Sequence, residues 1–366
     1  MSNTLRFRRI WFQIHKWIGI ALAILIIPIS ITGAALVWHD ALNDLLNPQR
    51  VVAAAPTLQP SQYAAAARSV AAPGENLVSL VYPGGGEGPV VAALAKPVKG
   101  PGRPVRTMVY LHPTDARVIE RTASNTGLIH VMHVLHGSLM IPGMGRQIVG
   151  WIGVAMLLSS LTGLWLWWPL KGGLRRGLRW KRQPETSGNL HHQGGFWIAI
   201  PLAVLSFTGA WISFPAFFAN FSGDPAPPSA AERARRLAAA PLAETRLTPE
   251  LALTSATSTA NGKLATIAWP TSSQPSWTVT LQGKGVRADV KVDDSTGKAT
   301  PPPPAKPETV ARLMRRIHDG TGMGIVWQVI IFLGGLIPAA LAVTGIMMWL
   351  NMRGRRRSME LRRRSA

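Results

Sequence analysis

The chain of 366 residues contains no cysteine. This absence excludes disulfide bonds, a thiolate nucleophile, iron–sulfur clusters, zinc sites built on cysteine, and haem attached covalently through a CxxCH motif. The chain also lacks a GxGxxG motif between a strand and a helix, a Walker loop and an HExxH helix. A nicotinamide or flavin cofactor bound through these motifs is therefore not expected.

Acidic residues are scarce as well: 17 Asp and Glu stand against 39 Lys and Arg, which gives a formal net charge of +22. Such a charge would fit nucleic-acid binding only in a soluble basic domain. Hydrophobic residues make up 47% of the chain and charged residues only 15%, which is too apolar for an ordinary soluble protein of this size. The composition indicates a membrane protein without a nucleic-acid partner.

Four apolar runs are long enough to cross a bilayer core of roughly 30 Å. None of them contains Asp, Glu, Lys or Arg, and each is bounded by aromatic and basic residues typical of membrane interfaces. The sequence therefore predicts a mainly α-helical membrane protein whose four spans are residues 17–38, 148–168, 196–218 and 324–350.

The basic residues predict the orientation of these spans. Residues 1–16, 169–191 and 351–366 together hold 17 basic and two acidic side chains. The positive-inside rule therefore places both termini and the 169–195 loop in the cytoplasm of a bacterium, with the first span as an uncleaved anchor in the inner membrane. The long segments 39–147 and 219–323 are then periplasmic, and residues 351–366 form a basic tail beside anionic lipid.

The chain carries an internal repeat. Each span contains a Thr-Gly pair, beginning at Thr32, Thr162, Thr208 and Thr344. His15 and His191 each lie 17 residues before the Thr of their span, and His136 and His318 each lie 26 residues before theirs. This register predicts two tandem two-helix repeats, each holding one external α+β lobe between its helices.

Histidines at matched positions near span ends are costly in a membrane and are usually functional. We expect His15 to face His191 on the cytoplasmic side and His136 to face His318 on the outer side, so that each pair provides the axial ligands of one haem iron. Without cysteine, both haems are b-type. Copper, zinc or non-haem iron, and a purely structural role, are the alternatives. Alternative ligands are His130 and His133 near His136, and His192 beside His191.

Other residues near these sites have more than one possible role. The Thr-Gly pairs serve either close helix packing or contact with haem. His112 is expected to be a surface residue, and His39 has no repeat partner. Four arginines near the outer histidines are candidate partners of the haem propionates: Arg146, Arg312, Arg315 and Arg316.

Five segments of the chain resemble the PepSY-associated transmembrane family, which includes bacterial iron-regulated membrane proteins and inner-membrane ferrisiderophore reductases. They are IHKWIGIAL, HGSLMIPGMGRQIVGW, TGLWLWWP, LHHQGGFWIAI and IHDGTGMG. The resemblance covers nearly the whole chain and maps the family's histidines to His15, His136, His191 and His318. It implies PepSY-like external lobes and a di-haem reductase that passes electrons to a periplasmic ferric siderophore and releases iron as Fe(II).

The electron donor under this hypothesis is either a cytoplasmic reductase or a quinol. Two other functions are compatible with the sequence. One is a membrane-anchored PepSY module that binds or regulates a periplasmic protein without redox activity. The other is a transporter for iron, haem or siderophore, which is disfavoured because the two-span repeats share one orientation and lack a broken helix with a charged midplane residue.

Overall fold

The computed structural model describes residues 3–96, 105–169, 173–180, 183–225, 228–229, 232, 241–242, 244–283, 287–303 and 307–364. The chain divides into two compact units. The first unit comprises residues 1–39, 131–227 and 308–366, and the second comprises residues 40–130 and 228–307. Lys171, Lys181 and Arg182 of the basic loop lie outside the described residues.

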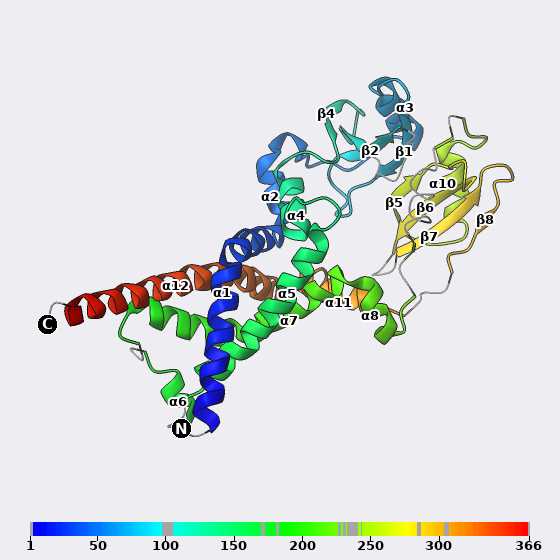
Figure 1. The fold of residues 1–366 in the computed structure, drawn as a ribbon. Helices are drawn as coiled ribbons and strands as arrows, with labels where there is room; N and C mark the ends of the chain where they lie inside the picture. Colours follow the sequence, from blue (N-terminus) through cyan, green and yellow to red (C-terminus); the bar gives the residue numbers. More distant parts are fainter. Residues whose placement is uncertain are drawn as a thin grey trace. The chain divides into compact units, whose positions relative to one another are not determined.

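Four long helices form the first unit (Figure 1): α1 (Asn3–Leu36), α5 (Gly145–Trp167), α7 (Thr186–Ser213) and α12 (Ile325–Arg364). Helix α1 packs against α5 and α12, and α7 packs against the same two helices. The helices thus form a ring in which α1 and α7 lie on one diagonal and α5 and α12 on the other. Shorter helices of this unit are α6 (Gly173–Gly177), α8 (Pro215–Ser222), α11 (Val310–Asp319) and most of α4 (Leu128–Ser138), whose first three residues belong to the second unit.

Both chain termini belong to the same end of this ring. Arg8 of α1 donates to the carbonyl of Trp168, just beyond the end of α5, over 3.0 Å. Glu185, which precedes α7, accepts from Asn351 and Arg355 of α12 over 2.7 and 2.5 Å. The start of α1 therefore lies beside the end of α5, and the start of α7 beside α12 near its end.

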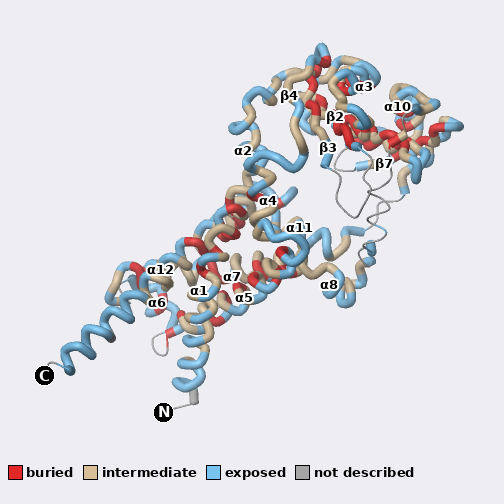
Figure 2. Tube along the Cα trace, turned by 45° about the horizontal axis from the view of Figure 1, so that its top comes forward, coloured by how far each residue is buried: buried red, intermediate tan, exposed pale blue. Residues whose placement is uncertain are grey.

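All four long helices have the length and composition of membrane spans. Only 22–33% of the residues in their most apolar windows are buried within the protein. The remaining apolar side chains face outward, among them Ile24, Trp197 and Ile200, which are 80%, 68% and 68% exposed. In Figure 2 the buried residues of the second unit gather on its strands and on the helices packed against them. Outward apolar faces are expected of helices solvated by lipid.

The helices differ from the apolar runs at their ends. Helix α1 begins at Asn3 and α7 at Thr186, so the helices continue into the expected cytoplasmic segments, and the basic tail continues α12 to Arg364. The third predicted span does not reach Phe218 as one helix. Helix α7 ends at Ser213, because Phe214 before Pro215 takes a non-helical conformation (φ −116°, ψ 55°) and Pro215 begins α8.

The second unit is built on a single antiparallel sheet in the order β4-β3-β2-β1-β5-β6-β7-β8. Residues 39–147 contribute β1 (Asn76–Val81), β2 (Val90–Ala95), β3 (Arg106–Leu111) and β4 (Val118–Ala123). Residues 219–323 contribute β5 (Lys263–Ala268), β6 (Ser276–Gln282), β7 (Arg287–Asp293) and β8 (Ala299–Thr300). Among its described residues, the helices of this unit are α2 (His39–Leu46), η1 (Pro48–Arg50), α3 (Pro60–Ser69) and α10 (Pro249–Thr257). Helix α2 begins at His39, which is the last residue of the 1–39 segment of the first unit.

The sequence predicted a separate α+β lobe in each external segment. Instead, the two segments together form one sheet. Strand β1 pairs with β5, with Leu80 opposite Ile267. This pairing converts what would be an exposed edge of each four-stranded half into the centre of one sheet. Helices α3 and α10 share one hydrophobic core with the sheet, in which Trp277 and Tyr63 are fully buried.

Candidate functional site

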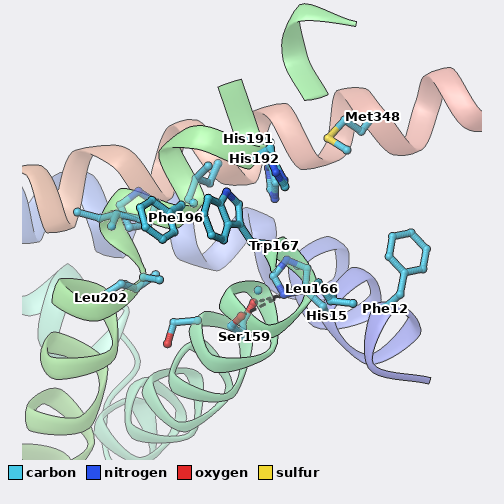
Figure 3. Close-up of a pocket in the computed structure, with 18 of the residues that line it drawn as sticks. Phe12, His15, Ser159, Leu166, Trp167, His191, His192, Phe196, Leu202 and Met348 are labelled. Atoms are coloured by element: carbon cyan, nitrogen blue, oxygen red, sulfur yellow. Dashed lines mark hydrogen bonds between the residues drawn. The ribbon is translucent and has the colours of Figure 1, made fainter. Parts of the chain in front are cut away.

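His15 of α1 and His191 of α7 approach each other from diagonally opposite helices. Their ring centroids are 6.3 Å apart and the ring planes are inclined by 84°. Both line a cavity of about 530 Å³ (Figure 3), within the range typical of sites for small molecules and cofactors. Apolar and small residues form much of its wall, including Phe12, Gly19, Ile26, Met156, Trp167, Gly195, Phe196 and Leu202.

His136 of α4 and His318 of α11 form a second pair, with ring centroids 6.0 Å apart and planes inclined by 40°. His136 contacts Gly33 of α1, and His318 contacts Gly209 of α7. Each glycine lies 18 residues after the histidine of the first pair on its own helix. Eighteen helical residues rise about 27 Å, so the two pairs lie near opposite ends of the spans.

The spacing within each pair matches two imidazoles bound to one metal ion. With N–metal bonds of about 2.0–2.1 Å and each ring centroid roughly 1.1 Å behind its nitrogen, rings on opposite sides of an ion have centroids about 6.2–6.4 Å apart. The observed values are 6.3 and 6.0 Å. Among the described residues, no group of three or more His, Asp or Glu could hold a metal ion. Each pair brings two imidazoles together, and a bis-histidine haem would take two such ligands.

The glycines of the Thr-Gly pairs make room for these rings. A Cβ atom added at Gly33 would lie 2.6 Å from Cε1 of His136, and one at Gly163 would lie 3.0 Å from Cε1 of His15. The corresponding distances are 3.1 Å from Gly209 to His318 and 3.5 Å from Gly345 to His191. Every histidine of the two pairs therefore lies against the glycine of a neighbouring span, which neither sequence interpretation of the Thr-Gly pairs anticipated.

Backbone carbonyls and threonine hydroxyls fix the tautomer of these rings. Nδ1 of His15 lies 3.0 Å from the carbonyl oxygen of Ser159, and Nδ1 of His136 lies 2.9 Å from that of Ile29. Nδ1 of His318 lies 3.1 Å from the carbonyl oxygen of Leu205. A carbonyl oxygen only accepts, so Nδ1 carries the proton and Nε2 keeps its lone pair.

His191 reaches the same state through a hydroxyl. Its Nδ1 lies 3.1 Å from Oγ1 of Thr344, and that hydroxyl donates its only proton to the carbonyls of Ala340 and Leu341. The hydroxyl must therefore accept from Nδ1–H of His191. Thr162 and Thr208 also lie within hydrogen-bond distance of the Nδ1 atoms of His15 and His318, at 3.2 and 3.0 Å. A partner behind Nδ1 that orients Nε2 is the usual arrangement of a metal-bound histidine.

The outer pair lies outside the long helices, and its electrostatics favour neutral rings. Desolvation by burial lowers the pKa of His136, with the backbone hydrogen bond to Ile29 opposing the shift. Desolvation by burial, reinforced by His136, lowers the pKa of His318 to about 4. Both rings are therefore neutral at pH 7, the form that coordinates a metal.

Two of the alternative ligands have ring contacts of their own, although His192 lines the same cavity as His15 and His191. His192 stacks on Trp167 with ring centroids 5.8 Å apart, and His133 lies against His39 at 6.3 Å. His130 lies on α4, six residues before His136. His112 lies 3.3 Å from the carboxylate of Asp115 in the second unit.

Two of the four candidate propionate partners have other contacts. Arg146 donates to the carbonyl of Ile212, and Arg316 pairs with Glu308 over 2.9 Å. Arg315 is close enough to His318 to affect its titration. Arg8 and Arg9 line the cavity of the inner pair, a position that no sequence motif indicates. Their place in the basic N-terminal segment suggested topology alone, and only the packing of α1 on α5 reveals their position.

Comparison with known protein families finds a match, and it covers the part of the chain that holds these sites. The family model described as the PepSY-associated TM region matches residues 12–351, which include all four histidines. The chain belongs to this family. No curated protein matches it. Family membership, together with the four apolar helices, makes this PepSY-associated chain a membrane protein.

Proposed function

We propose that this protein is a di-haem b oxidoreductase of the bacterial inner membrane. It passes electrons across the membrane to a ferric siderophore on the periplasmic side and releases the iron as Fe(II). His15 and His191 hold the inner haem, and His136 and His318 hold the outer one. The observation that carries the proposal is the presence of two facing imidazole pairs with metal-like spacing near opposite ends of one helix bundle.

When bound, haem supplies reversible one-electron chemistry at its iron. The residues of the chain supply the rest. Four Nδ1–H groups held by carbonyls or hydroxyls keep each Nε2 directed away from the helix that its ring contacts. The Thr-Gly pairs allow the rings to sit between helices, and much of the wall around the inner pair is apolar. A site of this kind favours a flat, largely apolar macrocycle over a hydrated ion.

The sidedness of the proposal combines the charge distribution with the fold. The end of the bundle that carries both termini and the His15–His191 pair also carries the basic segments, so we assign it to the cytoplasm. The His136–His318 pair then lies at the periplasmic end. The order of elements supports a tandem repeat, since α3-β1-β2-β3-β4-α4-α5 parallels α10-β5-β6-β7-β8-α11-α12.

The substrate class is supported by the family resemblance rather than by any feature of the sheet unit. A ferric siderophore binds Fe(III) through hard oxygen donors. One electron converts it to Fe(II), whose lower charge holds those donors less tightly. No proton or oxygen is consumed in this step. The electron comes from a cytoplasmic reductase or a quinol.

The test is the absorbance spectrum of the purified full-length protein, oxidised and after reduction with dithionite. The wild type should show bis-histidine haem b with two haems per chain. His136→Ala and His318→Ala should each lose one haem, His15→Ala and His191→Ala should each lose the other, and His112→Ala should lose neither. Adding a ferric siderophore to the reduced wild type should reoxidise it.

Two outcomes would overturn the proposal. A colourless protein from haem-replete cells would show that the protein binds no haem. If the histidine variants also kept function, the evidence would favour a non-redox PepSY module. Retention of both haems in all four histidine variants would show that these residues are not the ligands. A reduced protein that a ferric siderophore leaves unchanged would overturn the substrate assignment alone.

A further inference from the structure

A third pair of histidines lies outside both candidate haem sites. The rings of His39 and His133 have centroids 6.3 Å apart and planes inclined by 77°. This spacing equals that of His15 and His191 and matches two imidazoles on opposite sides of one metal ion. His39 is the first residue of α2, three residues beyond the end of α1, and His133 lies on α4 one turn before His136.

The backbone orients His39 as it orients the haem-site histidines. Nδ1 of His39 lies 3.2 Å from the carbonyl oxygen of Leu36. Since the carbonyl only accepts, Nδ1 carries the proton and Nε2 keeps the lone pair that a metal ion requires. The carbonyl behind Nδ1 of His39 is the second feature, besides the spacing, that points to a ligand.

Exposure distinguishes this pair from the other four histidines. His39 and His133 are both exposed residues, whereas His15, His136, His191 and His318 are partly buried or form a cavity wall. An exposed pair cannot enclose a macrocycle, but it leaves the remaining coordination positions open to water or to a chelator. Imidazole suits divalent iron, copper, nickel and zinc.

We propose that His39 and His133 form a solvent-accessible site for a divalent transition-metal ion, and that this ion is the Fe(II) produced by the protein. Binding of a divalent ion rests on the geometry of the pair alone. The identity of the ion rests on the proposed function, which would produce Fe(II) near His136, one helical turn from His133. Nitrogen ligands suit Fe(II) better than they suit Fe(III) held by hard oxygens, so the site accepts iron after reduction. With two protein ligands the ion remains exchangeable.

The experiment is an anaerobic titration of the full-length, detergent-purified protein with ferrous ion alone, in competition with a coloured ferrous chelator. The wild type should retain one Fe(II) per chain more than His39→Ala and His133→Ala. Loss of either ligand should weaken this binding by at least about tenfold, since losing even a group behind a ligand costs that much. His112→Ala is the matched control and should bind Fe(II) as the wild type does.

Haem absorbance per chain should be unchanged in all four proteins, which also reports that each variant folds. His39→Asn, which keeps a polar side chain, should show the same loss as His39→Ala. Equal Fe(II) retention by the wild type and the His39 and His133 variants would overturn the site. A loss of haem absorbance in His133→Ala would overturn it as well, because His133 would then belong to the haem ligands. If the wild type contained no haem but still lost Fe(II) on substitution of His39 and His133, the proposed function would fail while the metal site stood.

Discussion

A Cβ atom at Gly33 would come within 2.6 Å of Cε1 of His136. Non-bonded carbon atoms do not approach so closely, so the imidazole of His136 occupies space that only glycine leaves open. The repeat-related contact between Gly209 and His318 is looser, at 3.1 Å, and that between Gly345 and His191 is looser still, at 3.5 Å. The four glycines therefore form a graded series for testing how closely each ring depends on its helix.

We expect Gly33→Ala to displace His136 and to remove the outer haem from most of the protein while leaving the inner one. Gly345→Ala should leave both haems in place, because 3.5 Å is an ordinary van der Waals contact. Gly163→Ala and Gly209→Ala should give intermediate occupancies. Reduced haem absorbance per chain is the measurement. Gly137→Ala, beside His136 but in open space, controls for the added methyl group. Full haem content in Gly33→Ala would contradict the requirement for glycine beside His136.

Thr208→Val should change the outer haem without removing it. Valine keeps the shape of threonine but deletes the hydroxyl that lies 3.0 Å from Nδ1 of His318, while the carbonyl of Leu205 remains at 3.1 Å. The lost bond contributes about 1 kcal/mol, so we expect weaker haem retention at that site and a shifted reduction potential. Thr257→Val in α10 is the control, since the Thr257 hydroxyl donates to the carbonyls of Leu253 and Thr254 within its own helix and lies in the sheet unit. Equal potentials in the two variants would contradict a role for Thr208 in orienting His318.

The sequence predicted the four helices because a long apolar segment in lipid must satisfy its backbone hydrogen bonds internally, and an α-helix does so. The family assignment was correct as well. The sequence also selected four histidines that the structure brings together in two pairs, because a repeat register carries information about symmetry. The function of the Thr-Gly pairs was not predictable in this way. Gly33 meets His136 and Gly163 meets His15 only after helices remote in the chain have packed, and spacing along one helix does not encode that contact.

The other differences have the same origin. His39 has no repeat partner, so periodicity could not connect it with His133. The joining of β1 to β5 brings Val81 opposite Thr266, a pairing of segments that hydropathy treats as unrelated. Local patterns predicted strands in both segments, whereas the pairing of their edges depends on removing exposed backbone groups from solvent.

The buried carboxylate of Asp294 should be important for the stability of the sheet unit. It is 7% exposed and accepts from Nε1 of Trp277 over 2.8 Å and from the backbone N–H groups of Arg246 and Leu247 over 2.9 and 3.1 Å. Asp294→Ala leaves these donors without their acceptor and should cost about 3 kcal/mol, with roughly half that cost in Asp294→Asn. Urea unfolding of the full-length protein, followed by hydrogen exchange in β6 and β7, measures the effect. Lys291→Ala, an exposed neighbour on β7, should change it little.

The ion pair between Arg50 and Glu120 should make the stability of the sheet edge depend on pH. The two groups are joined by contacts of 2.6 and 2.8 Å, with side-chain exposures of 12% and 26%. The hydrogen bond from Arg50 lowers the pKa of Glu120 below its ordinary value of 4.5, against the effect of desolvation. A carboxylate whose pKa is lower in the folded state stabilises that state above the unfolded pKa, and this contribution is lost as the pH falls through the folded pKa.

Glu120→Gln should therefore destabilise β3 and β4 by about 1 kcal/mol at pH 7, the magnitude expected of a well-oriented surface pair. The difference from the wild type should disappear in acid, below the lowered pKa of Glu120, where the wild-type carboxyl is protonated too. Hydrogen exchange of β3 and β4 in both proteins, compared at each pH, measures it. Asp115→Asn removes a carboxylate that is 55% exposed and lies 3.8 Å from Arg117, and it should have no measurable effect at either pH. A pH-independent difference between Glu120→Gln and the wild type would mean that shape rather than charge makes Glu120 important.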